Sequence, residues 1–316
     1  MIERKRFSYD SVAQGIEVAG YLWLPEEYPK ALLVIAHGMT ESMVRYDDFA
    51  QTMAEKGLLV AGKDHLGHGE TAPSQEDLGY FGRVSYENKQ NADLQKLINI
   101  VSEQYPHVPL FVMGHSMGSF LVREYITEHG DDIAGAILSG PGDMNRFTVS
   151  CARILVDMMS LFKGQKFRSK FIQKLMFGAF NSRIKQPRTS FDWLTRDEAV
   201  VDEYLKHKEN GFIFTLNGFT HLLINIARVS QPSAFSDTPA DLPILLVGGA
   251  EDPVGDWGKA LPSLAEKYCK AGVRDVEMRL YPEDRHEVVN ELNKAEVDAE
   301  IFAWIEAHLP EGTTHE

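Results

Sequence analysis

Short apolar runs alternate with helical patterns along the first 140 residues of the chain. Apolar runs of about four to eight residues, bounded by turn residues, are typical of strands that are buried on both faces of a sheet. The chain has five such runs in this part, at residues 17–24, 31–36, 58–62, 110–113 and 134–138.

Helical periodicity fills the longer gaps between these runs. Apolar residues recur at three- and four-residue spacing over residues 86–104 and again over residues 117–128. This spacing gives each helix one apolar face that can pack on a sheet. The alternation therefore predicts an α/β fold with a mostly parallel sheet flanked by helices.

The same alternation returns near the end of the chain, with strand patterns at residues 242–247 and 276–280 and a closing helix. Residues 143–237 differ, because they carry helical patterns without a convincing strand and are bounded by glycines and prolines. We therefore expect residues 1–142 and 238–316 to form one sheet domain, and residues 143–237 to be a helical insertion.

Composition is that of an ordinary globular protein, with 44% hydrophobic and 25% charged residues. The 316 residues leave ample length for a buried core. The formal net charge is 32 minus 46, or −14. A surface of that charge repels phosphate backbones, so no nucleic-acid partner is expected.

Targeting and redox signals point to the cytoplasm. The N-terminal residues MIERKRFSYDS are not followed by the apolar stretch of a secretion signal. No aliphatic run approaches the roughly 20 residues that cross a bilayer. Cys151 and Cys269 are 118 positions apart and show no C-x-x-C spacing, which gives no support to a disulfide framework or a zinc ribbon.

The segment Gly114-His-Ser-Met-Gly118 follows a predicted strand and leads directly into a predicted helix. In that context G-x-S-x-G is typical of a nucleophile elbow, a strained turn that exposes the serine hydroxyl. Side chains two positions either side of the serine would clash, which explains Gly114 and Gly118. Ser116 is therefore the candidate nucleophile, and the alternative is an ordinary turn flanked by glycines.

A serine nucleophile needs a base and an acid, which follow it in the order serine, acid, histidine in this architecture. His286 lies just past the strand predicted at residues 276–280, and Asp252 lies just past the preceding one. Asp256 and Asp143 are alternative acids, because both also follow predicted strands. The competing interpretation is that these are solvated loop residues.

The oxyanion hole should use the backbone N–H of Met117, the residue after the nucleophile, and one from an earlier loop. His37-Gly38-Met39 supplies that loop directly after the strand at residues 31–36. We expect Met39 N–H to be the second donor and Gly38 to allow the close approach of the backbone.

Asp64-His-Leu-Gly-His-Gly69 could suggest a metal site, because two histidines lie three positions apart beside an aspartate. Its glycines indicate a tight turn and no third cluster of ligands accompanies it, so hydrogen bonding within the loop is favoured. His115 is interpreted as a packing residue, because a neighbour on the elbow faces away from Ser116. No metal and no other cofactor is expected.

Taken together, these motifs resemble the α/β-hydrolase superfamily, and within it the monoacylglycerol lipase, lysophospholipase and serine aminopeptidase-like group. The resemblance covers about residues 20–308, and its landmarks follow in order. They are His37-Gly38-Met39, Arg45-Tyr46, Asp64 to Gly69, Gly114 to Gly118, Asp252-Pro-Val-Gly255, and His286-Glu287 with Asn290-Glu291. Residues 139–141, 191–197 and 211–212 look like the bacterial lysophospholipase-like branch.

This resemblance implies an α/β-hydrolase fold with Ser116, Asp252 and His286 as its triad. It also implies that the insertion is a helical cap over the active site, placed between the strand after the elbow and the strand that carries the triad acid.

The predicted cap has two compositional features. It holds 11 of the 17 phenylalanines, which either line an acyl channel or form the cap's own core. Residues 158–191 carry eight Lys or Arg and no Asp or Glu, so this segment is +8 and the remainder is −22. Such a run is either a solvated helix face or a contact for an anionic membrane.

The sequence thus predicts a serine carboxylic-ester hydrolase acting on a small-molecule acyl ester of lipid type, a monoacylglycerol or lysophospholipid. It is expected in the cytoplasm, with peripheral contact to the inner membrane face through residues 158–191. Alternatives with the same triad are a small-ester esterase and a serine aminopeptidase. A non-catalytic, membrane-associated binding protein on a hydrolase scaffold is the alternative of another class.

Overall fold

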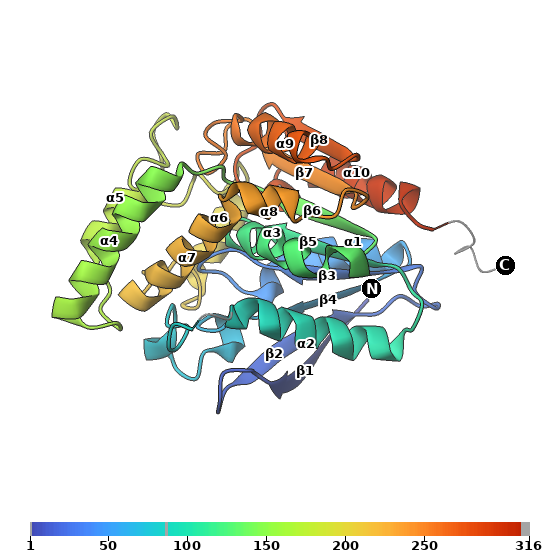
Figure 1. The fold of residues 1–316 in the computed structure, drawn as a ribbon, viewed down its shortest axis with the longest axis horizontal. Helices are drawn as coiled ribbons and strands as arrows, with labels where there is room; N and C mark the ends of the chain where they lie inside the picture. Colours follow the sequence, from blue (N-terminus) through green and yellow to red (C-terminus); the bar gives the residue numbers. More distant parts are fainter. Residues whose placement is uncertain (1, 86–87, 311–316) are drawn as a thin grey trace.

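The computed structural model of the chain describes residues 2–85 and 88–310. These residues form an eight-stranded sheet, with helices on both of its faces (Figure 1). The pairs β1–β2 and β2–β4 are antiparallel, and all later neighbours are parallel. In sheet order the strands are β1 (Arg4–Asp10), β2 (Glu17–Trp23), β4 (Leu58–Lys63), β3 (Ala31–Ala36), β5 (Leu110–His115), β6 (Gly135–Ser139), β7 (Ile244–Gly249) and β8 (Val276–Tyr281).

The five central strands are buried at every residue, as their apolar sequences require. Two apolar clusters cover the two faces of the sheet. One cluster includes side chains of α1 (Asp47–Glu55) and α10 (Lys294–Ala307). The other includes side chains of α2 (Lys89–Gln104), α3 (Met117–His129) and α9 (Ala260–Ala271).

The insertion between β6 and β7 is helical. It comprises α4 (Arg146–Lys163), α5 (Lys170–Phe177), α6 (Glu198–Lys206), α7 (Leu216–Val229) and α8 (Pro232–Ser236). A third apolar cluster packs Met117 and Phe120 of α3 against α4 and α7. Figure 1 shows α4 and α5 together at the left end of the molecule, beyond α7.

The predicted α/β architecture is therefore confirmed, with differences in its elements. The strand β1 was missed, because its alternating polar residues give no apolar run. The helices α1 and α9 were also missed. The strand β5 extends further than predicted, and β7 begins and ends two residues later than predicted, because glycines and a histidine at their carboxyl ends continue the ladder without apolar side chains. The helix predicted at residues 86–104 begins at Lys89, and Tyr86 lies outside the described residues.

Two further findings concern the chain as a whole. Within residues 2–85 and 88–310, no helix is both long enough and apolar enough to cross a membrane. Cys151 and Cys269 are both exposed, and neither forms a disulfide.

The buried carboxyl group of Asp298, in α10, should make the stability of the protein depend on pH. Burial raises the pKa of its carboxyl group to about 7, and its Oδ1 has no hydrogen-bond partner among the described residues. An unfolded aspartate has a pKa of about 3.9, so folding takes up a proton between those two values. The free energy of unfolding should therefore fall as the pH rises from 4 to 7.

We expect Asp298→Asn to remove this part of the pH dependence and to add about 1–3 kcal/mol to the free energy of unfolding at pH 8. Urea unfolding at pH 5 and pH 8 measures both effects. Glu306→Gln, at an exposed acid of the same helix, is the matched control. An Asp298→Asn curve that keeps the wild-type pH dependence would contradict the prediction.

Candidate active site

Ser116 lies between the end of β5 and the start of α3, in a strained backbone conformation. Its φ is 51° and its ψ is −115°, outside the regions that a residue with a side chain normally adopts. A Cβ on Gly114 would lie 2.3 Å from the carbonyl oxygen of Gly118, and one on Gly118 would lie 1.9 Å from that of Ala36. Both positions therefore require glycine, for the steric reason that the motif predicted.

His286 and Asp252 meet at the carboxyl end of the sheet, although 34 positions separate them in the sequence. His286 Nδ1 lies 3.0 Å from Asp252 Oδ2, and both side chains are buried. Asp252 Oδ1 also accepts the N–H of Val254 at 2.8 Å. A carboxylate at Nδ1 makes that nitrogen the donor, which leaves Nε2 free to accept a proton.

The protonation of His286 reflects two opposing effects. Burial alone would lower the pKa of its imidazole, but the negative charge of Asp252 and the hydrogen bond to it outweigh burial, so the pKa is raised. Asp252 therefore stabilises the imidazolium form although the ring is buried.

The two alternative acids have other partners. Asp143 accepts hydrogen bonds from Ser263 Oγ at 2.5 Å and from Lys267 Nζ at 2.5 and 2.6 Å. Asp256 is exposed and pairs with Lys259 Nζ at 3.2 Å. Of the three aspartates that the sequence offered, the structure brings Asp252 to His286.

Two backbone amides near the Ser116 side chain already donate hydrogen bonds within the protein and are not available to an oxyanion. Gly38 N–H donates to Glu41 Oε1 at 2.5 Å, and Ser116 N–H donates to the carbonyl of Ser139 at 2.9 Å. Met117 is the first residue of α3, where backbone amides have no acceptor within the helix. Met39 follows Gly38 and lines the same cavity as Ser116. This leaves the amides of Met117 and Met39 as the candidate donors to an oxyanion.

His37 shapes the loop that carries Met39. Its Nε2 accepts the N–H of His65 at 3.0 Å, so Nδ1 donates to the carbonyl of Gly38 at 2.8 Å. Burial lowers the pKa of His37 well below its ordinary value, which keeps the ring neutral, as one donor and one acceptor require.

The aspartate and histidines that invited a metal interpretation form hydrogen bonds within their own loop and also to β2, to Met43 and to His37. Asp64 accepts from Tyr21 Oη and from the amides of Met43 and Glu70 at 2.8 to 3.0 Å. His68 Nδ1 lies 3.0 Å from the carbonyl of Leu66.

His115, the elbow histidine, places Nδ1 3.2 Å from Ser139 Oγ. Its ring centroid lies 4.7 Å from that of His286. Burial lowers the pKa of His115 well below its ordinary value, so the ring is neutral where it packs against His286.

A buried ion cluster was not predicted from the sequence. Arg45 Nη1 lies 2.8 Å from Glu41 Oε2, and the same guanidinium pairs with both carboxylate oxygens of Glu287. Glu41 holds the Gly38 amide and Glu287 follows His286, so Arg45 links the oxyanion loop to the histidine loop. Arg45 and Glu287 are landmarks of the family resemblance, but no local pattern reveals that these charges are buried together.

A cavity of about 550 Å³ contains Ser116 and His286 in its wall. Apolar side chains from the insertion form much of the remainder. They are Met144, Met176, Phe177, Phe180, Phe191, Trp193, Leu194, Tyr204, Ile213, Leu222 and Ile226. The indole of Trp193 lies beside the imidazole of His286, with the ring centroids 5.1 Å apart.

Comparison with known proteins extends these findings. A monoacylglycerol lipase of Mycolicibacterium smegmatis is 27% identical over 311 residues, which cover 97% of this chain and 98% of that protein. A carboxyl esterase of Bacillus coagulans, solved in complex with glycerol, matches with a TM-score of 0.89 and 28% identity over 98% of this chain and 100% of that one.

A soluble variant of the monoglyceride lipase of Saccharomyces cerevisiae, solved with a substrate analog, has the same fold. The match has a TM-score of 0.75 and 19% identity, and covers 98% of this chain and 96% of that chain. The family model described as Serine aminopeptidase, S33 matches residues 27–293. This chain therefore belongs to the S33 serine aminopeptidase-like family of α/β-hydrolases and is a serine hydrolase of the lipase and esterase type.

Proposed function

We propose that this protein hydrolyses a monoacylglycerol or a lysophospholipid through an acyl-enzyme intermediate on Ser116. The cavity that contains Ser116 and His286 carries the proposal. Its volume of about 550 Å³ lies within the range of small-molecule sites, and its wall is mainly apolar. A single acyl chain is the ligand that such a wall would bury with the largest gain of free energy.

The proposed chemistry follows from the hydrogen bond between His286 and Asp252. Nε2 of His286 takes the proton of Ser116 Oγ as that oxygen attacks the ester carbonyl, and Asp252 stabilises the imidazolium that forms. The amides of Met39 and Met117 hold the oxyanion. His286 then gives the proton to the leaving alcohol. Water, activated by the same histidine, attacks the acyl-enzyme and releases the fatty acid.

An aminopeptidase would need an anionic group for the ammonium of its substrate. The described residues that line the cavity include two acids, Glu41 and Glu287, and both are paired with Arg45. This pairing favours an ester substrate without a free amino group. The name of the mycolicibacterial relative, a monoacylglycerol lipase, supports the same substrate class.

The outer face of the cap supports contact with a lipid surface. Leu161 and Phe162 at the end of α4 are each 84% exposed, and Phe147 at its start is 77% exposed. Ile154, Met158, Phe171 and Leu175 extend this apolar surface over α4 and α5. Large apolar residues gathered on one outer face are typical of a surface that binds membranes.

The basic residues of segment 158–191 divide into two groups. Lys166 pairs with Asp77, Arg168 donates to backbone carbonyls, and Arg188 pairs with Glu198 and Asp202. By contrast, five exposed residues, Lys163, Lys170, Lys174, Arg183 and Lys185, form no salt bridge with a described residue, and the first three of them lie on α4 and α5. These three lysines, next to the apolar surface, are the proposed contacts for anionic lipid, each worth about 1 kcal/mol at such a surface.

The roles of the triad can be tested with a fluorophosphonate probe and steady-state kinetics. Ser116→Ala should abolish labelling, because no activated hydroxyl remains. Asp252→Asn should lower kcat by about 10⁴, the loss known for the equivalent change in a serine protease. Asp143→Asn and Asp256→Asn are matched controls and should cost far less. Undiminished labelling of Ser116→Ala, or full activity of Asp252→Asn, would overturn the corresponding assignment.

The substrate class can be tested with a chain-length series of monoacylglycerols and lysophospholipids, with short esters and aminoacyl amides alongside. We expect kcat/KM to rise by up to about fourfold per methylene until the cavity is filled, which corresponds to about 0.8 kcal/mol per buried methylene. A preference for short esters would identify a small-ester esterase. Faster hydrolysis of aminoacyl amides than of every ester would identify a peptidase.

Membrane contact can be tested by co-sedimentation with vesicles. Binding should require anionic lipid, fall with salt, and drop at least tenfold when Leu161→Ser, Phe162→Ser and Lys163→Gln are combined, about 1.4 kcal/mol or more. Hydrolysis of a short soluble ester should not change, because none of these residues lines the cavity. Met278→Ser, at an exposed residue of β8, is the matched control. Equal binding of the triple variant and the wild type would reject this surface.

A further inference from the structure

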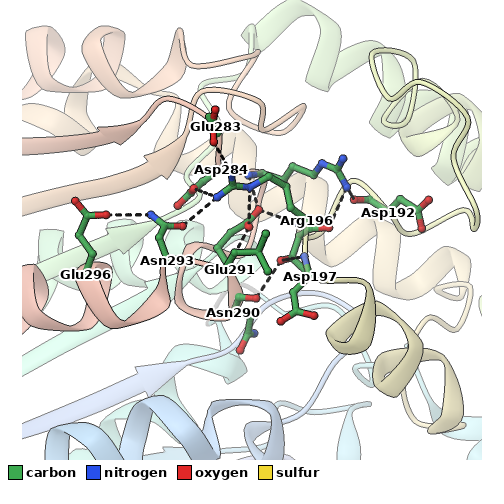
Figure 2. A network of polar contacts seen from close by, with 12 residues as sticks. Asp192, Arg196, Asp197, Glu283, Asp284, Asn290, Glu291, Asn293 and Glu296 are labelled. Atoms are coloured by element: carbon green, nitrogen blue, oxygen red, sulfur yellow. Dashed lines mark hydrogen bonds and ion pairs between the residues drawn. The ribbon is translucent and has the colours of Figure 1, made fainter.

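Residues 191–197 of the cap, Phe-Asp-Trp-Leu-Thr-Arg-Asp, lie against residues 283–293, the loop that follows β8 and carries His286 (Figure 2). We call residues 192–197 the cap strap and residues 283–293 the histidine loop. The sequence motif of the strap resembles one branch of the family, but the proposed chemistry gives it no role. Its contacts in the structure supply one.

The strap contacts the backbone of the histidine loop at His286 itself. The N–H of His286 donates to the carbonyl of Trp193 at 3.4 Å, and the next N–H donates to the carbonyl of Leu194 at 2.8 Å. Thr195 Oγ1 donates to the carbonyl of Asn290 at 3.0 Å. In the opposite direction, Arg285 Nη1 donates to two strap carbonyls at 2.6 and 3.0 Å. The chain on both sides of His286 is therefore hydrogen-bonded to the cap.

Arg196 is the centre of the polar network in Figure 2. Its Nε lies 3.0 Å from Glu291 Oε2, and its Nη1 lies 2.8 Å from Glu283 Oε2. Its Nη2 donates to Asp284 Oδ1 at 2.7 Å and to Asn293 Oδ1 at 3.1 Å. One guanidinium thus contacts four side chains of the histidine loop, a geometry that a lysine cannot reproduce.

The two buried acids of this network depend on that cation. Asp284 and Glu291 are each only 1% exposed. Glu291 Oε1 also accepts the backbone N–H groups of Arg196 and Arg285, so the same carboxylate joins strap and loop directly. Removal of one partner from a buried ion pair leaves an uncompensated charge, which the chain relieves by moving or by admitting water. Loss of Arg196 would therefore disturb the loop one or two residues from His286.

We propose that Arg196 is a positioning residue for His286: from the cap, it holds the histidine loop so that Nδ1 stays on Asp252 and Nε2 faces Ser116. This inference rests on the proposed function, in which His286 is the base. A base displaced by about 1 Å can cost about 100-fold in rate, so a contact remote from the substrate can control the chemical step.

The test compares Arg196→Gln with Arg188→Gln on a short soluble ester. Arg188 is a matched control, because it pairs with two acids of the cap and makes no described contact with the histidine loop. We expect Arg196→Gln to lower kcat about 10- to 100-fold with KM changed less than about threefold, and Arg188→Gln to lower neither. Arg196→Lys keeps a positive charge beside the buried Asp284 and Glu291 and should recover part of the lost kcat.

A double-mutant cycle separates positioning from a general structural effect. In a His286→Ala background, the residual hydrolysis of an activated ester no longer uses the base, so Arg196→Gln should cost nothing further. The same fold-loss in both backgrounds, or a wild-type kcat for Arg196→Gln, overturns the proposal. If Arg196→Gln does not fold, the same cycle is run with Arg196→Lys, whose smaller loss in kcat must likewise vanish without His286.

Rejection of the positioning role can be distinguished from failure of the proposed function. If Ser116→Ala and His286→Ala retain wild-type activity, the proposed function fails and the positioning role fails with it. If those two variants lose activity while Arg196→Gln and Arg196→Lys match the wild type, the positioning role alone is rejected.

Discussion

The backbone of Ser116 is the constraint on which the rest of the site depends. The positive φ of this residue turns the chain sharply between β5 and α3, and it can be held because the flanking glycines allow backbone to touch backbone. A Cβ on Gly38 would lie 3.3 Å from that of Ser116, so the loop after β3 also packs directly on the elbow. The nucleophile, the oxyanion loop and the start of α3 are thus fixed by mutual close contact.

Two arginines that pair with buried carboxylates extend this rigidity to loops that cannot pack as tightly. Arg45 joins the oxyanion loop to Glu287, and Arg196 joins the cap strap to Glu291 on the far side of His286. A buried ion pair adds little net stability, because desolvation offsets most of the attraction. Its directional hydrogen bonds nevertheless specify one geometry, which suits a histidine that must contact both an aspartate and a serine.

The apolar residues of the cap lie both on the side that faces the cavity and on its outer side. Phe177, Phe180 and Phe191 face the cavity, while Phe147 and Phe162 face outward. The sequence left open whether the phenylalanines line a channel or form a core of the cap, and the structure contains both kinds, since Phe214 and Phe219 are fully buried. These two outward phenylalanines lie on α4, whose other face packs on α7, and the sequence alone does not tell which face of the helix is covered.

Elements and motifs whose physics is local could be predicted from the amino-acid sequence. Buried parallel strands need continuous apolar runs, a helix on a sheet needs one apolar face, and a strained elbow needs glycine on both sides of its serine. What these patterns could not supply is the partner of each polar group. The order of the residues and the family resemblance favoured Asp252, but its contact with His286, the other partners of Asp143 and Asp256, and the ion pairs of Arg45 and Arg196 are visible only in the tertiary structure. Those contacts join residues up to 242 positions apart, and their energy depends on distance and burial, which no local pattern encodes.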